Sequence, residues 1–541
     1  MDGGSVAWWR QKRTKASIDF ERPYGSQPLT SSLAAVRGTD PTGLAVPALR
    51  LAALLDPDGH PHALWTQAPL LAYLAAHRTS PAGKDTARGN SQVTADQVHA
   101  TLRLLHRRAL LMCDPSAEPR GVRVHASTAR AVRETISDTD LPRLTVAAAD
   151  ALLEAWPEAD QHQAQLAAVL RANTFALADH TEGHLWFPEV HLVLYRAGQS
   201  LRNGELADAA VGYWQEMASR IERLHGSGHP DTLSARNNLA VSYRQEGRTD
   251  RAVRLLERVL AAREGQLGPD HPDTLTTRAN LAVSYWQEGR VDEAIDLEER
   301  VLAAREGQLG SDHPDTLTTR ANLAVSYWQE GRVDEAIDLE ERVLAAREEQ
   351  LGSDHPDTLT TRAHLALSYR RKGRADEAVR LLERVLAARE EQLGPDHPDT
   401  LTTRANLAVS YWQEGRVDEA IDLEERVLAA REEQLGSDHP DTLTTRAHLA
   451  LSYDDVGRVE EAIETTERVL AARERILGVD HLDTIATRAD LAGMYWQEAH
   501  FFNATALLIQ VVAARERLLG ADHPDTLTAR GDLDELLAIP D

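Results

Sequence analysis

Histidine is the residue type whose number and spacing in this chain most suggest metal chemistry. The sequence contains 22 histidines, and eight of them recur at a fixed interval of 42 residues, at the start of the word His-Pro-Asp-Thr-Leu or its one variant, His-Leu-Asp-Thr-Ile. The eight are His229, His271, His313, His355, His397, His439, His481 and His523. Zinc requires nitrogen ligands about 2 Å from the ion, whereas residues that occur once per stacked unit lie on the order of 10–20 Å apart. We therefore expect no metal site, and we expect these histidines at helix N-terminal caps or in loops.

Three other candidate motifs do not fit the zinc site, the phosphate-binding loop or the catalytic carboxylate pair that they resemble. The string HTEGH at residues 180–184 resembles a zinc-protease helix motif, but its glutamate is misplaced and Gly183 disfavours a helix. The string PAGKD at residues 81–85 comes nearest to a phosphate-binding loop, but it lacks the first glycine and Asp85 replaces the magnesium-binding hydroxyl. Paired carboxylates such as Glu298 and Glu299 recur in several copies, whereas a catalytic pair is expected once. The sequence thus predicts no catalytic residue, no cofactor and no enzymatic activity.

The fixed interval implies a stack of similar structural units that position these side chains. In the copy at residues 271–312, Pro272 suits the first position of a helix, and Leu281 and Tyr285 belong to an apolar stripe at helical spacing. Gly289 ends this helix, and a second amphipathic helix follows. A unit of this size cannot bury its apolar stripe alone. We therefore predict an all-α fold, a superhelix of stacked helix pairs.

Composition and charge narrow the class of protein. The chain has 541 residues and a formal net charge of −26, which argues against nonspecific binding to nucleic acid or to anionic membranes. Cys113 is the only cysteine, so no internal disulfide can form. The N-terminal residues lack a signal-peptide core, and no run of about 18 apolar residues occurs. These features predict a cytoplasmic protein without a membrane partner.

The chain before the repeats divides into three predicted parts. Residues 1–43 form a partly disordered leader with a basic stretch, residues 44–140 a small domain, and residues 141–186 a helical connector. Within the small domain the pattern predicts helices at 45–55, 64–76, 94–108 and 127–136, with a strand pair at 109–113 and 122–125. The array fills residues 187–522, with a degenerate first repeat at 187–228 and seven 42-residue repeats from residue 229. Residues 523–541 add a capping helix.

The repeat resembles that of tetratricopeptide-repeat (TPR) proteins. Leu281, Ala282, Tyr285, Gly289 and Ala294 stand at TPR spacing. The longer 42-residue period, with Gly-x-Asp-His-Pro-Asp between units, is similar to the repeats of kinesin light chains and their bacterial relatives. The resemblance implies a right-handed superhelix that binds a peptide or protein in its concave groove.

The small domain resembles a second family. Residues 49–55, 104–111 and 122–125 are similar to the winged-helix segment of signal-transduction ATPases of the NB-ARC (STAND) type, whose ATPase domain has no counterpart in this sequence. This resemblance implies a role in bacterial signalling or defence, with a separate nucleotide-binding signalling protein as a partner.

One arginine position is constant across the eight copies and allows two interpretations. Arg278 stands for this position, which lies near Leu281 and Tyr285 by helical angle. The arginines could form a basic groove for an acidic peptide. Alternatively, their stems pack between helices and their heads pair with acids of the Glu298 type, and we favour this packing interpretation.

A second position varies from copy to copy, and we predict that it carries recognition. The resemblance places it, with the equivalents of Thr276, Ala279, Val283 and Gln287, on the concave groove. Tryptophan and arginine, which often carry binding energy at protein interfaces, dominate it; the alternative is that these tryptophans pack against the next repeat. The candidate groove residues are Asn237, Arg244, Trp286, Gln287, Trp328, Gln329, Arg370, Trp412, Gln413 and Trp496.

These observations favour a non-enzymatic interaction scaffold or sensor. The alternative is a transcriptional regulator that binds DNA through the winged helix and uses the array as effector sensor. Arg103, Arg107, Arg108, Arg120 and Arg123 motivate this alternative. The surrounding segment has no strong excess of positive charge, so we expect nucleic acid not to be the partner.

Overall fold

Helices make up almost all of the regular structure. The computed structural model describes residues 29–79, 92–157, 160–181, 183–204 and 206–538. In these ranges the helices are accompanied by three short 3₁₀ turns and one two-stranded sheet, which confirms the predicted all-α class. The basic N-terminal stretch and the PAGKD string at residues 81–85 lie outside the described residues. The chain forms two compact units, Met1–Arg290 (unit 1) and Val291–Asp541 (unit 2), and each is described by itself.

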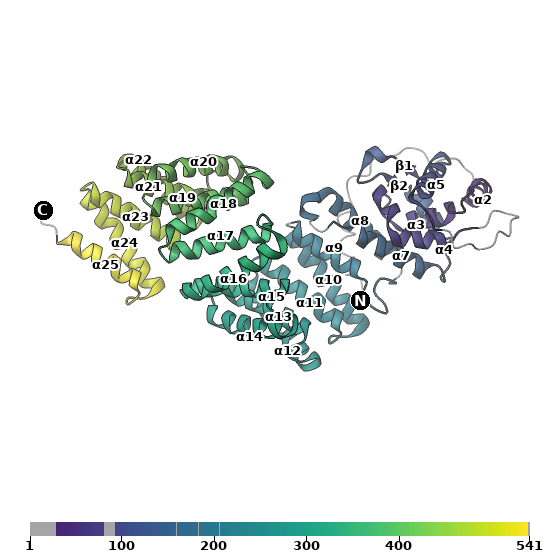
Figure 1. The fold of residues 1–541 in the computed structure, drawn as a ribbon, viewed down its shortest axis with the longest axis horizontal. Coiled ribbons are helices and arrows are strands. Elements are labelled where there is room, and N and C mark those ends of the chain that lie inside the picture. Colours follow the sequence, from purple (N-terminus) through teal and green to yellow (C-terminus); the bar gives the residue numbers. More distant parts are fainter. Residues whose placement is uncertain (1–28, 80–91, 158–159, 182, 205, 539–541) are drawn as a thin grey trace, which may run out of the picture. The chain divides into compact units, whose positions relative to one another are not determined.

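Unit 1 begins with short helices and a small hairpin (Figure 1). Thr94 forms the predicted capping box, because its side chain accepts a hydrogen bond from the Gln97 backbone N–H while the Gln97 side chain accepts one from the Thr94 N–H. The helix predicted at 64–76 is divided, since Gln67 is extended between a 3₁₀ turn and the following helix. The elements are α2 (Leu29–Thr39), α3 (Ala45–Leu54), η1 (His62–Thr66), α4 (Ala68–Ala76), α5 (Ala95–Arg107), β1 (Met112–Cys113), η2 (Pro115–Ala117), β2 (Val122–Arg123) and α6 (Ala126–Arg133), with β1 antiparallel to β2.

The remainder of unit 1 joins the connector to the first repeats. One hydrophobic core runs from Val36 in α2 to Leu239 in the second repeat, so the N-terminal helices and the start of the array share buried side chains. The limits predicted at residues 43, 140 and 186 remain predictions. The helices are α7 (Leu141–Glu154), α8 (Ala164–His180), α9 (Leu192–Asn203), α10 (Ala207–His225), α11 (Pro230–Gln245), α12 (Thr249–Leu267) and α13 (Pro272–Gln287), with η3 (Asp160–Gln163) before α8.

Unit 2 alternates long second helices with first helices that begin at the repeated histidine. Its core is divided into small clusters, each shared by neighbouring repeats; one contains Ile295, Leu323, Tyr327 and Ala336. Such nearest-neighbour packing is expected of a repeat array. The second helices are α14 (Val291–Leu309), α16 (Val333–Leu351), α18 (Ala375–Leu393), α20 (Val417–Leu435), α22 (Val459–Ile476) and α24 (Phe501–Leu519). The first helices are α15 (Pro314–Glu330), α17 (Pro356–Arg371), α19 (Pro398–Gln413), α21 (Pro440–Asp455), α23 (Leu482–Gln497) and α25 (Pro524–Leu537).

The repeated histidines cap the first helices, as predicted. In α19, the Nδ1 atom of His397 accepts a hydrogen bond of 3.2 Å from the Asp399 backbone N–H, and Pro398 stands at the first helical position. The same cap occurs at all eight histidines of the series. At the other end, Gly331 caps α15 with a φ of 86°, a conformation that a side chain would strain.

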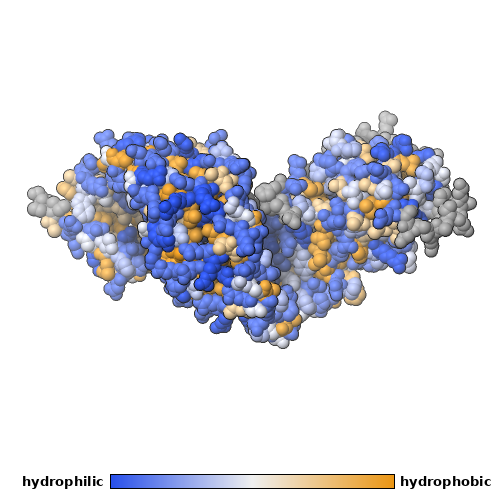
Figure 2. All heavy atoms as spheres, viewed as in Figure 1, coloured by the Kyte–Doolittle hydropathy of each residue, from blue (hydrophilic) through white to orange (hydrophobic). Residues whose placement is uncertain are grey.

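The array helices present a mainly polar surface. On the face shown in Figure 2, hydrophilic residues predominate and hydrophobic ones are scattered. None of the helices in the described ranges is long and apolar enough to cross a membrane.

Candidate partner-binding surface

The constant arginines of the Arg278 series lie in the packing between repeats. Arg320 donates a hydrogen bond of 2.6 Å to Glu306, and Arg404 one of 2.6 Å to Glu390, so each guanidinium pairs with an acid at the end of the preceding second helix. The side chain of Arg362 is only 1 % exposed and pairs with Glu348 in the same way. The packing interpretation is therefore confirmed, and the basic-groove interpretation is wrong for this series because its charge is already neutralised.

The acid partner that we predicted for these arginines is wrong. Glu298, Glu340 and Glu424 are buried elsewhere in the array, at 2–4 % exposure. The Ser326 hydroxyl donates a 2.7 Å hydrogen bond to Glu298, and the same contact measures 2.9 Å at Glu424. Burial raises the pKa of these three carboxyls from 4.5 to about 7, although hydrogen bonding from serine opposes the rise.

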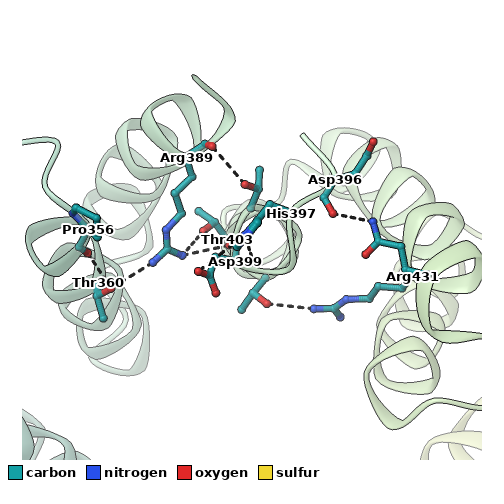
Figure 3. Close-up of polar contacts among 11 residues, drawn as sticks. Pro356, Thr360, Arg389, Asp396, His397, Asp399, Thr403 and Arg431 are labelled. Carbon is teal, nitrogen blue, oxygen red and sulfur yellow. Dashed lines mark hydrogen bonds and ion pairs between the residues drawn. The ribbon is translucent and has the colours of Figure 1, made fainter. Parts of the chain in front are cut away.

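A different set of arginines lies between the first helices of unit 2. Figure 3 shows Arg389 of α18 extending to Thr360 of α17 on one side and to Thr403 of α19 on the other. Its Nη1 donates to the Asp399 backbone carbonyl at 3.2 Å and to the Thr403 hydroxyl at 2.8 Å, and its Nη2 reaches the Thr360 hydroxyl at 3.4 Å. Arg431 repeats these contacts one unit later.

We call this set the arginine row; it consists of Arg305, Arg347, Arg389, Arg431 and Arg473. Within the described part of unit 2, the hydrogen bonds of the row go to carbonyl and hydroxyl oxygens, and no member forms an ion pair with a carboxylate. Burial lowers the pKa of Arg389, Arg431 and Arg473, and the aspartate at the start of the next first helix offsets part of this effect. The row is therefore positive charge that the chain does not neutralise by contact.

Side chains of the first helices alternate with the row. Burial lowers the pKa of His364, and the positive charges of Arg389 and Arg347 lower it further, so both guanidiniums act on the His364 ring. His364 is nevertheless exposed to solvent. His364 therefore combines contact with water and proximity to two guanidiniums.

The same arrangement continues along the array. Burial lowers the pKa of His448, and Arg370, Arg473 and Arg431 contribute to the decrease. Burial raises the pKa of Asp490, while arginines on either side oppose the rise. We call this surface the first-helix face and define it by Asn322, His364, Asn406, His448 and Asp490 with the arginine row.

The predicted tryptophans differ in how far they are available to a partner. Trp328 is half-buried, and the Arg371 guanidinium of the next first helix lies 4.5 Å from its ring centroid. Trp412 is 38 % exposed, and its Nε1 donates a hydrogen bond to Asp455 of the next first helix. Trp496 is half-buried beside a cluster in the last repeats. Each ring thus combines packing with access to solvent.

The remaining candidate residues of unit 2 also range from half-buried to exposed. Arg370 donates to the Asn406 backbone carbonyl at 3.4 Å, and burial lowers its pKa. Gln329 and Gln413 are exposed. The structure therefore brings these side chains onto successive first helices.

The candidates in unit 1 contribute less free surface. Asn237 is 7 % exposed, and its side-chain oxygen accepts a hydrogen bond of 3.4 Å from Asn280. Arg244 donates to the Asn280 backbone carbonyl at 3.5 Å. Trp286 is half-buried and Gln287 is exposed.

The arginine row was missed by sequence reasoning. Its members recur at the same interval of 42 residues as the Arg278 series, so the signal was present in the sequence. Periodicity alone does not separate a neutralised arginine from an unpaired one, because the difference depends on how neighbouring helices are turned toward each other. The 42-residue spacing predicts the repeat, but only the structure shows which arginines have a carboxylate partner.

Comparisons with known proteins were made for the sequence and for the fold. Family models described as tetratricopeptide repeat match residues 189–265, 247–307, 299–349, 316–391, 357–433, 413–474 and 484–525. No curated protein matches the chain.

Several solved structures are similar to this chain. A kinesin light chain protein of Podosopora anserina with nearly identical TPR-like repeats is 38 % identical, with coverage of 38 % of this chain and 97 % of that one and a TM-score of 0.35. BtubC (BKLC) from P. vanneervenii is 23 % identical over 44 % of this chain and 93 % of that one, with a TM-score of 0.37. A STAND protein with a tetratricopeptide repeat sensor from Pyrococcus horikoshii is 12 % identical over 95 % of this chain and 68 % of that one, with a TM-score of 0.57. The last likeness is one of fold.

Proposed function

Because the chain belongs to the tetratricopeptide repeat family, whose repeats form protein–protein interaction scaffolds, we propose that its first-helix face binds an extended segment of a partner protein. One observation carries the proposal. The histidine caps and the Arg278 series stay constant between repeats, whereas one partly exposed position of the first helices varies, at Trp328, Arg370, Trp412 and Trp496.

The chemistry of these positions suits a protein ligand. Tryptophan and arginine supply large contact areas and strong hydrogen bonds, and they dominate binding energies at protein interfaces. Here they stand on helices that packing holds rigid, so a partner would not need to order them. Trp412 is the best placed, because more than a third of its side chain is open to solvent.

Capture experiments with the full chain test this proposal. The immobilised protein is compared with the variants Trp412→Ala and Leu393→Ala, because Trp412 and Leu393 are both 38 % exposed, and Trp412 belongs to a first helix whereas Leu393 belongs to a second helix. A partner that is retained by wild type and Leu393→Ala but lost by Trp412→Ala, with helicity unchanged, supports the proposal. Equal retention of every captured protein by the two variants contradicts it.

We further propose that the protein is the sensor part of a signalling system whose nucleotide-binding part is a separate chain. The winged-helix resemblance of residues 44–140 and the fold likeness to a STAND protein with a TPR sensor support this role. Calorimetric titration of the full chain with ATP and with ADP tests it. Saturable heat of nucleotide binding to this chain would contradict the proposal that nucleotide binding resides on a separate chain.

A further inference from the structure

The last second helix, α24, carries an apolar stripe on its water-facing side. Figure 1 shows α24 and α25 in yellow, at the C-terminal end of the array. The stripe consists of Phe502, Ala506, Ile509 and Ala513, which are all exposed, and we call it the α24 seam. Phe502 is 87 % exposed, and the opposite side of α24, for example Leu508, is buried in its own repeat. Exposed apolar surface of this kind marks a contact with another molecule.

The other second helices carry charge where the seam is apolar. In every second helix from α12 to α22, the residues equivalent to Phe502, Ala506 and Ile509 are acids or arginines. In α20, for example, they are Asp418, Asp422 and Glu425. The repeat therefore folds with charged residues at these positions, so its own packing does not require the apolar side chains of α24.

A neighbouring position of α25 changes together with the seam. In the preceding repeat, the Tyr453 hydroxyl donates a hydrogen bond of 2.9 Å to Glu425, twenty-eight residues earlier. The residues equivalent to this pair in the last repeat are Leu537 and Ile509, which are 63 % and 52 % exposed. Because α25 packs on α24, this equivalence extends the apolar surface from α24 to Leu537.

The seam is complementary to a second copy of itself. Its residues follow one another at intervals of four, three and four, which is the 3.5-residue period of a helix pair. If two copies of α24 run antiparallel about a two-fold axis between positions 507 and 508, Phe502 faces Ala513 and Ala506 faces Ile509 of the other copy. Each large side chain then meets a small one, and a two-fold axis uses the same surface on both chains.

The charges around the seam also fit this pairing. The chain has a formal net charge of −26, so two copies repel each other over most of their surface. The first turn of α24 contains no acid, whereas the first turns of α14, α16, α18, α20 and α22 do. Antiparallel pairing brings Glu516, the next position of the seam, to the N-terminal end of the other α24, where the helix dipole favours a carboxylate. Glu516 also pairs with Arg530 in its own copy.

We propose that the chain forms a symmetric dimer through antiparallel pairing of its α24 helices, with Leu537 at the edge of the contact. The inference goes beyond the proposed function, because the seam lies on a second helix and leaves the first-helix face for a partner. A stable interface of standard size buries about 1,600 Å². One helix pair buries less, so we expect a dissociation constant on the order of 10 µM.

Sedimentation equilibrium of the full chain from about 1 to 200 µM tests the proposal. The weight-average mass should rise from 59.7 kDa toward twice that value. Raising the salt concentration from about 50 to 500 mM should tighten the dimer, because salt screens the repulsion between two acidic chains and leaves an apolar contact intact. A chain that stays monomeric at every concentration, or a dimer that salt weakens, would overturn the inference.

Two double variants assign the contact to the seam. Phe502→Asp with Ile509→Glu introduces the residue types that α20 carries at these positions, so the helix should remain folded, and dimerisation should weaken at least about tenfold. The matched control, Leu518→Glu with Leu527→Glu, adds the same charge at side chains that are 49 % and 50 % exposed and lie outside the seam. It should change the dissociation constant less than about twofold. Equal weakening by both variants, with circular dichroism unchanged, would contradict the assignment.

Disulfide formation tests the antiparallel direction. In a Cys113→Ser background, one chain carries Phe502→Cys and another carries Ala513→Cys, and the two are oxidised separately and as a mixture. Antiparallel pairing places these two positions opposite each other, whereas either position lies roughly 16 Å along the helix axis from its own copy. The mixture should therefore form covalent dimers faster than either chain alone. No gain in the mixture, or faster reaction of Ala513→Cys alone, would overturn the antiparallel pairing.

Discussion

Three buried glutamates should make the array more stable in mild acid than in mild base. Glu298, Glu340 and Glu424 occupy one position of the second helix, and the equivalent position in α18 is Leu382, which is fully buried. The chain thus contains its own precedent for an apolar side chain there. We predict that the triple variant Glu298→Leu, Glu340→Leu, Glu424→Leu folds and loses most of the pH dependence of stability.

The sign and size follow from the pKa values. Burial raises the pKa of each carboxyl from 4.5 to about 7 in the folded state. Below pH 4.5 the group is neutral in both states and stability is complete. Between pH 4.5 and 7 the unfolded chain releases the proton while the folded chain holds it, so stability falls as pH rises and the loss is complete above about 7. The displacement corresponds to about 3 kcal/mol per site, as an upper value for buried groups.

Urea denaturation followed by circular dichroism from pH 5 to pH 8.5 measures the effect. The wild-type midpoint should fall across this range, while the triple leucine variant should start higher at pH 8 and change little. Glu349→Gln, at an exposed position of α16, removes a charge without changing a buried group and should follow wild type. Parallel profiles for wild type and the triple variant would refute the assignment, because all other side chains are common to the two proteins.

Three further predictions concern stability. Arg362→Ala should cost about 2–3 kcal/mol and Arg530→Ala less than about 1 kcal/mol, because their side chains are 1 % and 41 % exposed in otherwise similar ion pairs. Equal changes in the urea midpoint would contradict this ranking. Trp328→Ala should cost about 2 kcal/mol and Trp412→Ala less, since the first ring is half-buried beneath a guanidinium. The reverse order in thermal denaturation would show that Trp412 is the packing residue. Thr94→Ala should cost about 1 kcal/mol through loss of the capping box, and unchanged hydrogen exchange in the first turn of α5 would refute it.

Local features of the fold could be predicted because their causes lie within a few residues. His397 and Pro398 begin a helix, and Gly331 ends one, through hydrogen bonds and backbone angles that do not depend on the rest of the chain. The helix predicted at 64–76 was wrong at its start, because Gln67 is extended and Pro69 suits the beginning of a new helix there. Local propensity does not determine how far a helix continues across such a boundary.

Contacts across the repeat boundary could not be predicted. Arg362 pairs with Glu348 fourteen residues earlier, and Glu298 meets Ser326 twenty-eight residues later. Both contacts depend on the angle between successive helices, which periodicity does not supply. The arginine row shows the same limit, since Arg389 and Arg404 recur identically in the sequence but only Arg404 has a carboxylate partner.

The division of the unit 2 core into repeat-sized clusters has a consequence for folding. Residues 312–348 and 396–432 are identical in sequence, so a second helix from one copy finds the same apolar surface on the wrong first helix. Such a mispairing closes a loop longer by two repeats, at a cost of only about 3 kcal/mol. Few positions distinguish the correct neighbour; Thr466, which meets Met494 instead of a serine, is one. Misaligned stacks and exchange of helices between chains should therefore compete with native folding, and more strongly as protein concentration rises.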